Sequence, residues 1–322
     1  MTRLGYQIPN FTYPGVAEAG IFSNVVQQAT AAEAAGFDRL FVMDHFYQLP
    51  GIGAPNEPML ECYTMLSALA QHTETVRLSA LVTGNTYRNP ALLAKTITAL
   101  DHVSGGRATL GIGAGWFELE HQSLGFDFGT FTDRFEKLEE ALQIIIPLLR
   151  GERVSFDGVH YRVADAFNVP APISRIPVMI GGSGEKKTLR MVAQYADESN
   201  LVGTPPRDIP RKLDALAAHC DQLGRDRSEI TVTAMQMVCV APTMAEAEAD
   251  LAELAAAKGW SDAVVDMAKN ILVFGDVDTV GEQLQASMDA GIDGLTLNLP
   301  VNGHKTERIG LLGELAGPIT AR

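Results

Sequence analysis

Two adjacent ionisable residues, Asp44 and His45, directly follow a short apolar run and have the chemistry for acid–base work. The run spans residues 40–43, and the helix expected before it, over residues 21–35, ends at Gly36. A strand this apolar is typical of a parallel sheet buried on both faces. Side chains at the carboxyl end of such a strand form active sites in α/β proteins. Imidazole exchanges protons near neutral pH, so His45 is a catalytic candidate that Asp44 could tune, although a purely structural histidine is the alternative.

A glycine-rich segment, Gly181-Gly182-Ser183-Gly184, precedes a predicted helix and could bind an anion. Glycines let backbone N–H groups approach a ligand, and a helix N-terminus carries positive potential. Ser183 adds a hydroxyl and Lys186 adds positive charge. The alternative is an ordinary glycine-rich turn between a strand and a helix.

A second glycine-rich segment, Gly111-Ile112-Gly113-Ala114-Gly115-Trp116, does not complete the dinucleotide pattern, because Trp116 stands at the third glycine position. The glycines are better explained by close approach of the backbone to a flat ligand, with Trp116 as a wall. Glu120 and His121 follow on a stretch predicted to be irregular. The two alternatives for them are a place in the site or a place on the solvated surface. Arg134 lies in the first turn of the next helix, where the positive potential of the helix N-terminus disfavours a cation. A nearby phosphate or a surface ion pair would explain its presence.

Strands and helices alternate along the chain and predict a single (β/α)8 TIM barrel of class α/β over residues 1–322. The clearest helix spans 131–149, with apolar residues at three-and-four spacing. The alternation is interrupted at about residues 153–175, where Asp157-Gly158 between two apolar runs predicts an antiparallel insertion.

Composition favours a soluble protein that acts on small molecules. The formal net charge of −14 argues against nucleic acid and anionic membrane surfaces, which require a basic face. The three cysteines are widely spaced and predict neither a disulfide framework nor a metal site. With no apolar run of membrane-spanning length and no leader pattern, we expect a cytoplasmic location.

Taken in order, five motifs resemble the luciferase-like flavin and deazaflavin oxidoreductases, a family of modified (β/α)8 barrels. They are Asp44-His45, Ser79 to Thr83 before Asn89-Pro90-Ala91, Gly111 to Trp116, Asp133-Arg134-Phe135 and Gly181 to Gly184. The resemblance implies an isoalloxazine-type ring near His45, a non-proline cis peptide at Ala80–Leu81, and a phosphate held by Ser183 and Arg134. We therefore expect His45, Asp44 and Glu120 to be catalytic. The expected cofactor-binding residues are Ala80, Leu81, Thr83, Asn85, Gly115, Trp116, Arg134, Gly181, Gly182, Ser183, Gly184 and Lys186.

The segment from Gly181 to Thr188 looks most like the branch that depends on coenzyme F420, a deazaflavin that transfers hydride at C5. An FMN-dependent monooxygenase of the same fold is the alternative, and a non-catalytic cofactor-binding barrel is a third hypothesis. Two positions depart from the sugar-phosphate dehydrogenases of this branch: Trp116 replaces a glutamate and Leu49 replaces a tryptophan. Oxidation of glucose 6-phosphate is therefore doubtful, the substrate is not identified, and the resemblance favours a homodimer.

Overall fold

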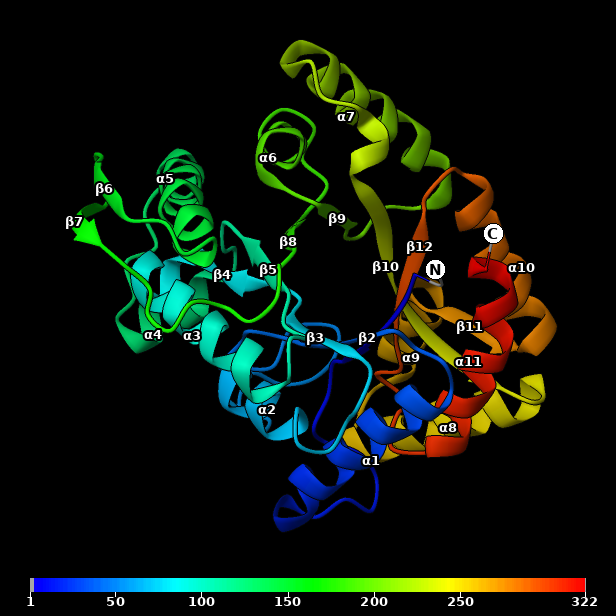
Figure 1. The fold of residues 1–322 in the computed structure, drawn as a ribbon. Coiled ribbons are helices and arrows are strands. Elements are labelled where there is room, and N and C mark those ends of the chain that lie inside the picture. Colours follow the sequence, from blue (N-terminus) through cyan, green and yellow to red (C-terminus); the bar gives the residue numbers. More distant parts are fainter. Residues whose placement is uncertain (1–2, 322) are drawn as a thin grey trace.

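The computed structural model describes residues 3–321, and parallel strands with helices outside them form a nearly closed barrel (Figure 1). The strand order is β3-β2-β1-β12-β10-β9-β8-β5-β4. The bounds of these strands are β1 Leu4–Ile8, β2 Arg39–Val42, β3 Arg77–Ala80, β4 Thr83–Gly84, β5 Leu110–Gly113, β8 Val178–Gly181, β9 Glu198–Leu201, β10 Thr231–Ala241 and β12 Gly294–Asn298. A single parallel bridge between Leu78 of β3 and Ala108, just before β5, links the two sides of this nearly closed ring. The predicted barrel fold is confirmed.

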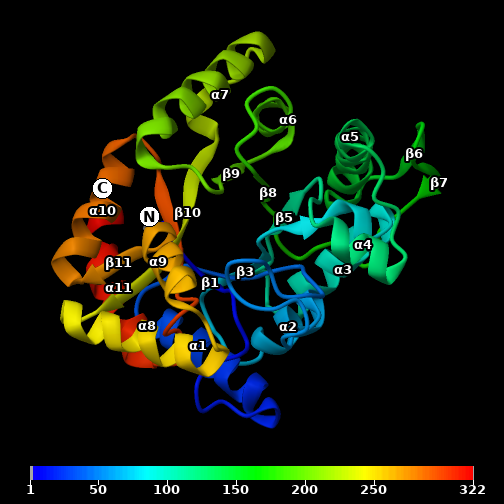
Figure 2. The same ribbon diagram turned by 180° about the vertical axis from the view of Figure 1, so that it is seen from behind.

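Helices alternate with these strands and cover the outside of the barrel (Figures 1 and 2). Their bounds are α1 Ile21–Ala34, α2 Cys62–Leu69, α3 Pro90–Val103, α4 Glu118–Leu124, α5 Phe131–Leu149, α6 Thr188–Tyr195, α7 Ile209–Leu223, α8 Met244–Lys258, α9 Asp262–Ile271, α10 Val277–Asp289 and α11 Thr306–Thr320. Apolar residues on their inner faces and on the strands form one large buried core. The longest helix, α5, begins with a capping box in which Thr130 and Asp133 satisfy each other's backbone N–H groups. None of the described helices is long and apolar enough to cross a membrane.

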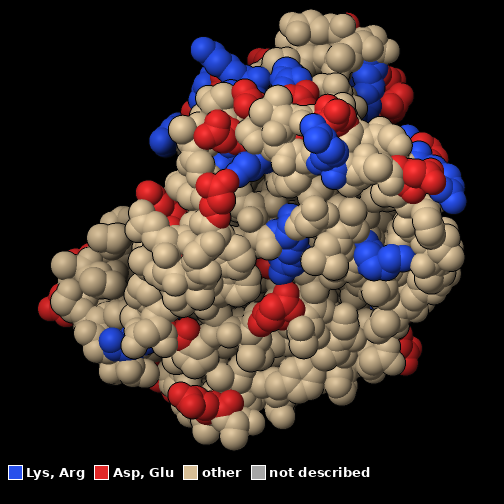
Figure 3. Space-filling view, turned by 90° about the vertical axis from the view of Figure 1, so that its left-hand side faces the viewer, with Lys and Arg blue, Asp and Glu red and all other residues tan. Residues whose placement is uncertain are grey.

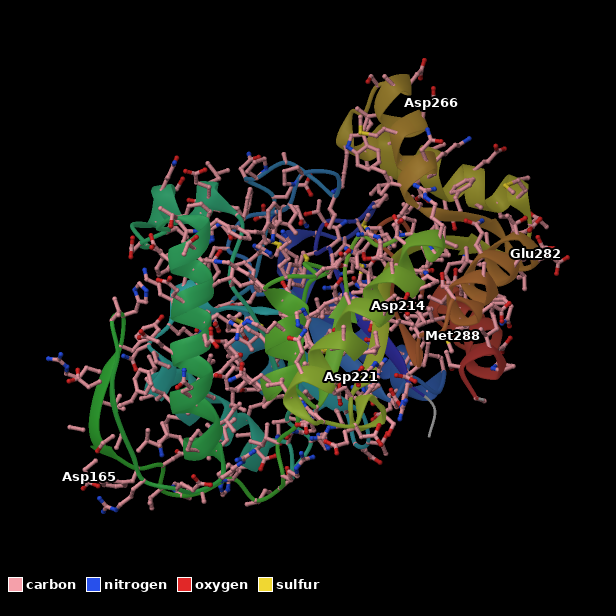
Figure 4. All side chains as sticks on the ribbon, turned by 90° about the horizontal axis from the view of Figure 1, so that it is seen from above. Asp165, Asp214, Asp221, Asp266, Glu282 and Met288 are labelled. Atoms are coloured by element: carbon pink, nitrogen blue, oxygen red, sulfur yellow. The ribbon has the colours of Figure 1, made fainter. Side chains whose placement is uncertain are left out.

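The antiparallel insertion is present as the hairpin of β6 (Val154–Asp157) and β7 (Arg162–Ala166), which projects beside α5 (Figure 1). Asp157 pairs with Arg162, so the connection spans residues 158–161. Asp157 therefore belongs to β6, and only Gly158 of the Asp157-Gly158 pair lies in the connection. Asp165 of β7 lies at the outer edge of the molecule (Figure 4).

Three local expectations are wrong. Residues 118–124 form α4 rather than an irregular stretch, because Gly125 in a left-handed conformation gives this short helix a defined end. A short strand, β11 (Val273–Asp276), lies between α9 and α10 and extends β10 outside the barrel path. The strand after α2 is split into β3 and β4, and the cis peptide bond between them is Leu81–Val82 instead of Ala80–Leu81.

Glycines of β5 and β8 make room for this split strand. A Cβ on Gly111 would lie 2.1 Å from the carbonyl oxygen of Ala80, and one on Gly113 would lie 2.9 Å from Val82. A Cβ on Gly181 would lie 2.8 Å from Val82 as well. Such distances are too short for any side chain. Close packing against the Ala80 carbonyl and the Val82 side chain, rather than approach to a flat ligand, therefore explains Gly111 and Gly113.

Candidate active site

A cavity of about 410 Å³ opens at the carboxyl ends of the strands, where barrel enzymes build their sites. Its lining combines residues that follow β2, β4, β5, β8 and β9 with residues of β10 and β12. Five of the residues that line it come from the sequence motifs that follow β2, β5 and β8: Asp44, His45, Gly115, Trp116 and Gly182. The barrel therefore brings motifs together that are more than 130 residues apart in the sequence.

His45 lies in the cavity wall with 13% of its side chain exposed. Its Nδ1 is 2.9 Å from Oε2 of Glu120, and the ring of Trp116 stands edge-on to the imidazole with 5.9 Å between centroids. A carboxylate at Nδ1 holds a hydrogen on that nitrogen and fixes the orientation of the ring. Nε2 is then the atom of His45 left to meet a ligand.

Glu120 is fully buried behind His45, on α4. Its carboxylate accepts hydrogen bonds from the backbone N–H groups of Phe46 and Tyr47 and, at 2.6 Å, from the Tyr87 hydroxyl. Burial raises the pKa of this carboxyl, but the hydrogen bonds from His45, Tyr87 and Tyr47 outweigh it, so the pKa of Glu120 is lowered. Glu120 thus stays ionised near neutral pH and does not itself line the cavity.

Asp44 makes its hydrogen bonds to groups other than His45. Its buried carboxylate accepts two from Arg88, at 2.6 and 2.9 Å, and one from the N–H of Gly84 at 3.1 Å. Arg88 also bonds Glu61 at 2.7 Å. Burial lowers the pKa of this guanidinium, but Asp44 more than compensates and raises it above its ordinary value. The pair ties the end of β2 to the segment after β4.

The floor of the cavity is formed by Leu81 and Val82, together with two amides from the first and last barrel strands. Gln7 donates a hydrogen bond to the Leu81 carbonyl at 3.2 Å and accepts one from Asn298 at 2.6 Å. The Oδ1 atom of Asn298 is buried and has no partner among residues 3–321. A flat polar ring above this floor would meet a fixed backbone surface and an unsatisfied amide oxygen.

The glycine-rich segment after β8 reaches the cavity through Gly181 and Gly182. The N–H of Gly182 is occupied by the Asn200 carbonyl at 2.9 Å. The Ser183 hydroxyl donates to the Val202 carbonyl at 2.7 Å and accepts from Thr204 at 2.8 Å. No hydrogen bond between described residues occupies the N–H groups of Ser183 and Gly184. These two N–H groups, just before α6, are the donors available to an anion.

The charged residues near this segment differ in what they contact. Glu185 pairs with Arg211 and Lys212, so its charge is compensated away from the glycines. Lys186 is exposed. Arg134 donates hydrogen bonds to the carbonyls of Gly115 and Gly129 at 3.1 and 3.2 Å, and its guanidinium stacks on Phe128.

The model of the luciferase-like monooxygenase family matches residues 2–294. The chain belongs to this family. An F420-dependent glucose-6-phosphate dehydrogenase from Microbacterium testaceum is 31% identical over 227 residues, which cover 68% of this chain and 65% of that protein. A protein of the same name from Segniliparus rotundus is 27% identical, and the match covers 91% of this chain and 92% of that one.

A solved structure described as an F420-dependent secondary alcohol dehydrogenase in complex with an F420-acetone adduct has the same fold. It superimposes with a TM-score of 0.80 at 20% identity, covering 100% of this chain and 99% of that one. The predicted resemblance to the luciferase-like family is therefore confirmed.

In this luciferase-like barrel the predicted cofactor residues fall into two groups. Those that line the cavity are Leu81, Thr83, Gly115, Trp116, Gly181 and Gly182, and those that do not are Ala80, Asn85, Arg134, Ser183, Gly184 and Lys186. Ala80 is packed in the hydrophobic core, and the amide of Asn85 bonds the Tyr161 hydroxyl at 3.4 Å.

Sequence reasoning missed Gln7, Tyr87, Arg88, Met237 and Asn298 as residues of the cavity or its support. The first and last of these stand at the ends of β1 and β12, so their polarity at a strand end was a usable signal. Arg88 carried no comparable signal, because a single arginine before a helix is common on protein surfaces.

Proposed function

We propose that this protein is a coenzyme F420-dependent oxidoreductase that transfers hydride between the deazaflavin C5 and a small organic substrate. The observation that carries the proposal is one ligand-sized cavity lined by His45, which an ionised Glu120 orients, and by the floor residues Leu81 and Val82. The names of the two dehydrogenases that match this chain support F420 as the cofactor.

The residues present fit such a cofactor. The floor offers a fixed backbone and the unsatisfied Asn298 oxygen to a polar ring, and Trp116 stands at one side of the cavity. The free N–H groups of Ser183 and Gly184 suit a phosphate at the start of α6. When bound, the deazaflavin supplies the hydride chemistry. The protein supplies orientation, exclusion of water and a proton position at Nε2 of His45.

The Ser183 hydroxyl holds the anion-binding segment against the end of β9, so Ser183→Ala is expected to weaken F420 binding about tenfold, or ~1.4 kcal/mol. Ser228→Ala is the control and should leave the affinity unchanged. Ser228 is exposed and lies just before the start of β10, outside the glycine-rich segment. Fluorescence titration of the apoprotein with F420 measures both. Tighter binding of FMN than of F420 by the unsubstituted protein would contradict the cofactor assignment.

A homodimer and a cytoplasmic location also remain proposals. Exposed apolar side chains of α3 and of the segment after β7, among them Leu92, Val169 and Ile173, support a subunit contact. Sedimentation velocity tests the dimer.

Cys62, Cys220 and Cys239 are all free and buried, which is compatible with a reducing compartment. The opposite charges are interspersed on the face that Figure 3 shows.

A further inference from the structure

The part of the cavity away from the floor is lined by apolar side chains. They come from the loop after β2, from β10 and from the end of α9: Leu49, Pro50, Ile52, Met237 and Ile271. Among the described residues that line the cavity there is no lysine or arginine. Its one carboxylate, Asp44, is engaged by Arg88. A buried anion needs a compensating charge, and this wall offers none.

A lysine, Lys258, adjoins this wall, and its ammonium group is already paired with a carboxylate. Lys258, at the end of α8, has a side chain only 5% exposed. Its Nζ donates to the Ile52 carbonyl at 3.0 Å and to Glu57 at 2.6 Å. Lys258 therefore fastens the loop after β2 to α8 and is not free to meet an anionic substrate.

A second, smaller hollow continues the apolar surface beyond Ile52, Met237 and Ile271, which line both spaces. Its own lining is apolar and includes Leu254, Trp260 and Leu272. The hollow is about 20 Å³, close to the room that one water molecule needs. Because methionine is flexible and polarizable, Met237 can move aside and join the two spaces for a longer ligand.

Resting on the proposed function, we infer that the substrate is an uncharged, largely apolar molecule with a single carbonyl or hydroxyl group. The polar group faces Nε2 of His45, and the hydrocarbon part lies along Leu49, Ile52 and Met237 toward Trp260. Sugar phosphates do not match this wall, although the dehydrogenases that resemble this chain carry glucose 6-phosphate in their names.

The direct test is turnover of 2-alkanones from 2-butanone to 2-octanone with reduced F420. Each turnover adds a hydride and a proton to the ketone and oxidises one F420 molecule. Burial of each added CH₂ should raise kcat/KM about fourfold until the cavity is filled. Oxidation of glucose 6-phosphate by F420 should be undetectable. A kcat/KM that is flat along the series, or a preference for the sugar phosphate, overturns the inference.

Variants of Met237 test the wall itself. Met237→Gln keeps the length of the side chain but places an amide in the apolar surface, and kcat/KM for 2-octanone should fall at least about tenfold. Met237→Leu should stay within about threefold of the unsubstituted enzyme. Met267→Gln is the matched control, since the side chain of Met267 is 58% exposed on α9. Figure 4 shows the preceding residue, Asp266, at the outer edge of the molecule. Equal effects of Met237→Gln and Met267→Gln would contradict the assigned wall.

Tryptophan fluorescence separates this inference from the cofactor assignment. The chain has two tryptophans, and Trp116 lines the cavity while Trp260 lines the hollow. Added to the apoprotein, 2-octanone should change the emission and bind more tightly than 2-butanone, and Trp260→Phe should reduce the change. If this holds but F420 does not bind, the cofactor assignment fails alone. If F420 binds and the ketones show no chain-length dependence, the substrate inference fails.

Discussion

Replacement of His45 with alanine is expected to lower the single-turnover rate of hydride transfer by at least about a hundredfold, the usual lower range for a general acid or base. The imidazole is held through Nδ1 by the buried Glu120, so Nε2 can exchange a proton with the substrate or stabilise charge on the cofactor ring. Affinity for F420 should change less than about tenfold, because the binding surface is otherwise intact. Stopped-flow absorbance with saturating F420 measures the rate.

His72→Ala is the matched control, since His72 is exposed and contacts Phe22 outside the cavity. A His45 variant that keeps its rate while losing stability would make His45 a structural residue. His121 would not then be a convincing replacement. Its two ring nitrogens are already bonded, to Thr86 at 2.7 Å and to the Phe117 carbonyl at 2.8 Å.

Because Glu120 contacts His45 and does not line the cavity, we propose that it is a positioning residue, and we expect its role to show in the pH profile. Its depressed pKa keeps it ionised near neutral pH. Glu120→Gln removes that charge, so the apparent pKa of the group governing kcat should fall along with the rate. A change in stability with an unaltered pH profile would mean that Glu120 serves only to pack α4.

Replacing Arg88 with methionine is expected to lower the free energy of unfolding by about 3–5 kcal/mol, because it leaves the buried Asp44 carboxylate without its cationic partner. Asp44 makes both of its side-chain ion-pair contacts with this arginine, at 2.6 and 2.9 Å. Urea denaturation at pH 7 measures the change. The same substitution should displace the end of β2 and so reduce activity as well.

The double variant Asp44→Asn with Arg88→Met should recover a large part of the lost stability, because no buried charge then remains uncompensated. Arg162→Met removes an exposed partner of Asp157 and should cost less than about 1 kcal/mol. If Arg88→Met is no more destabilising than Arg162→Met, the Asp44 pair does not support the fold.

Much of the fold follows from local sequence. The helix Phe131–Leu149 is found as predicted, because its apolar residues at three-and-four spacing specify one buried face. The short strand β11 escaped prediction, since a four-residue strand between two helices has no periodicity of its own. Helix α4 was missed for a similar reason, as seven residues are too few to establish a helical pattern.

The sequence predicts those site residues that are marked by their position at a strand end. It does not predict which side chains form hydrogen bonds with each other in the folded protein. His45 stands at a strand end, which an apolar run reveals. That His45 pairs with Glu120 and Asp44 with Arg88 depends on contacts between residues 75 and 44 positions apart. No spacing rule in one sequence reports such contacts, and the adjacency of Asp44 to His45 suggested that Asp44, rather than Glu120, tunes the imidazole.

The glycines packed against the split strand restrict how this enzyme can be re-engineered. Gly111, Gly113 and Gly181 have no space for a side chain, because Ala80 or Val82 already fills it. Libraries aimed at a new substrate would waste diversity at those positions. Randomising Leu49, Ile52, Met237 and Ile271 instead would alter the cavity wall while the floor beneath the reacting atoms keeps its shape.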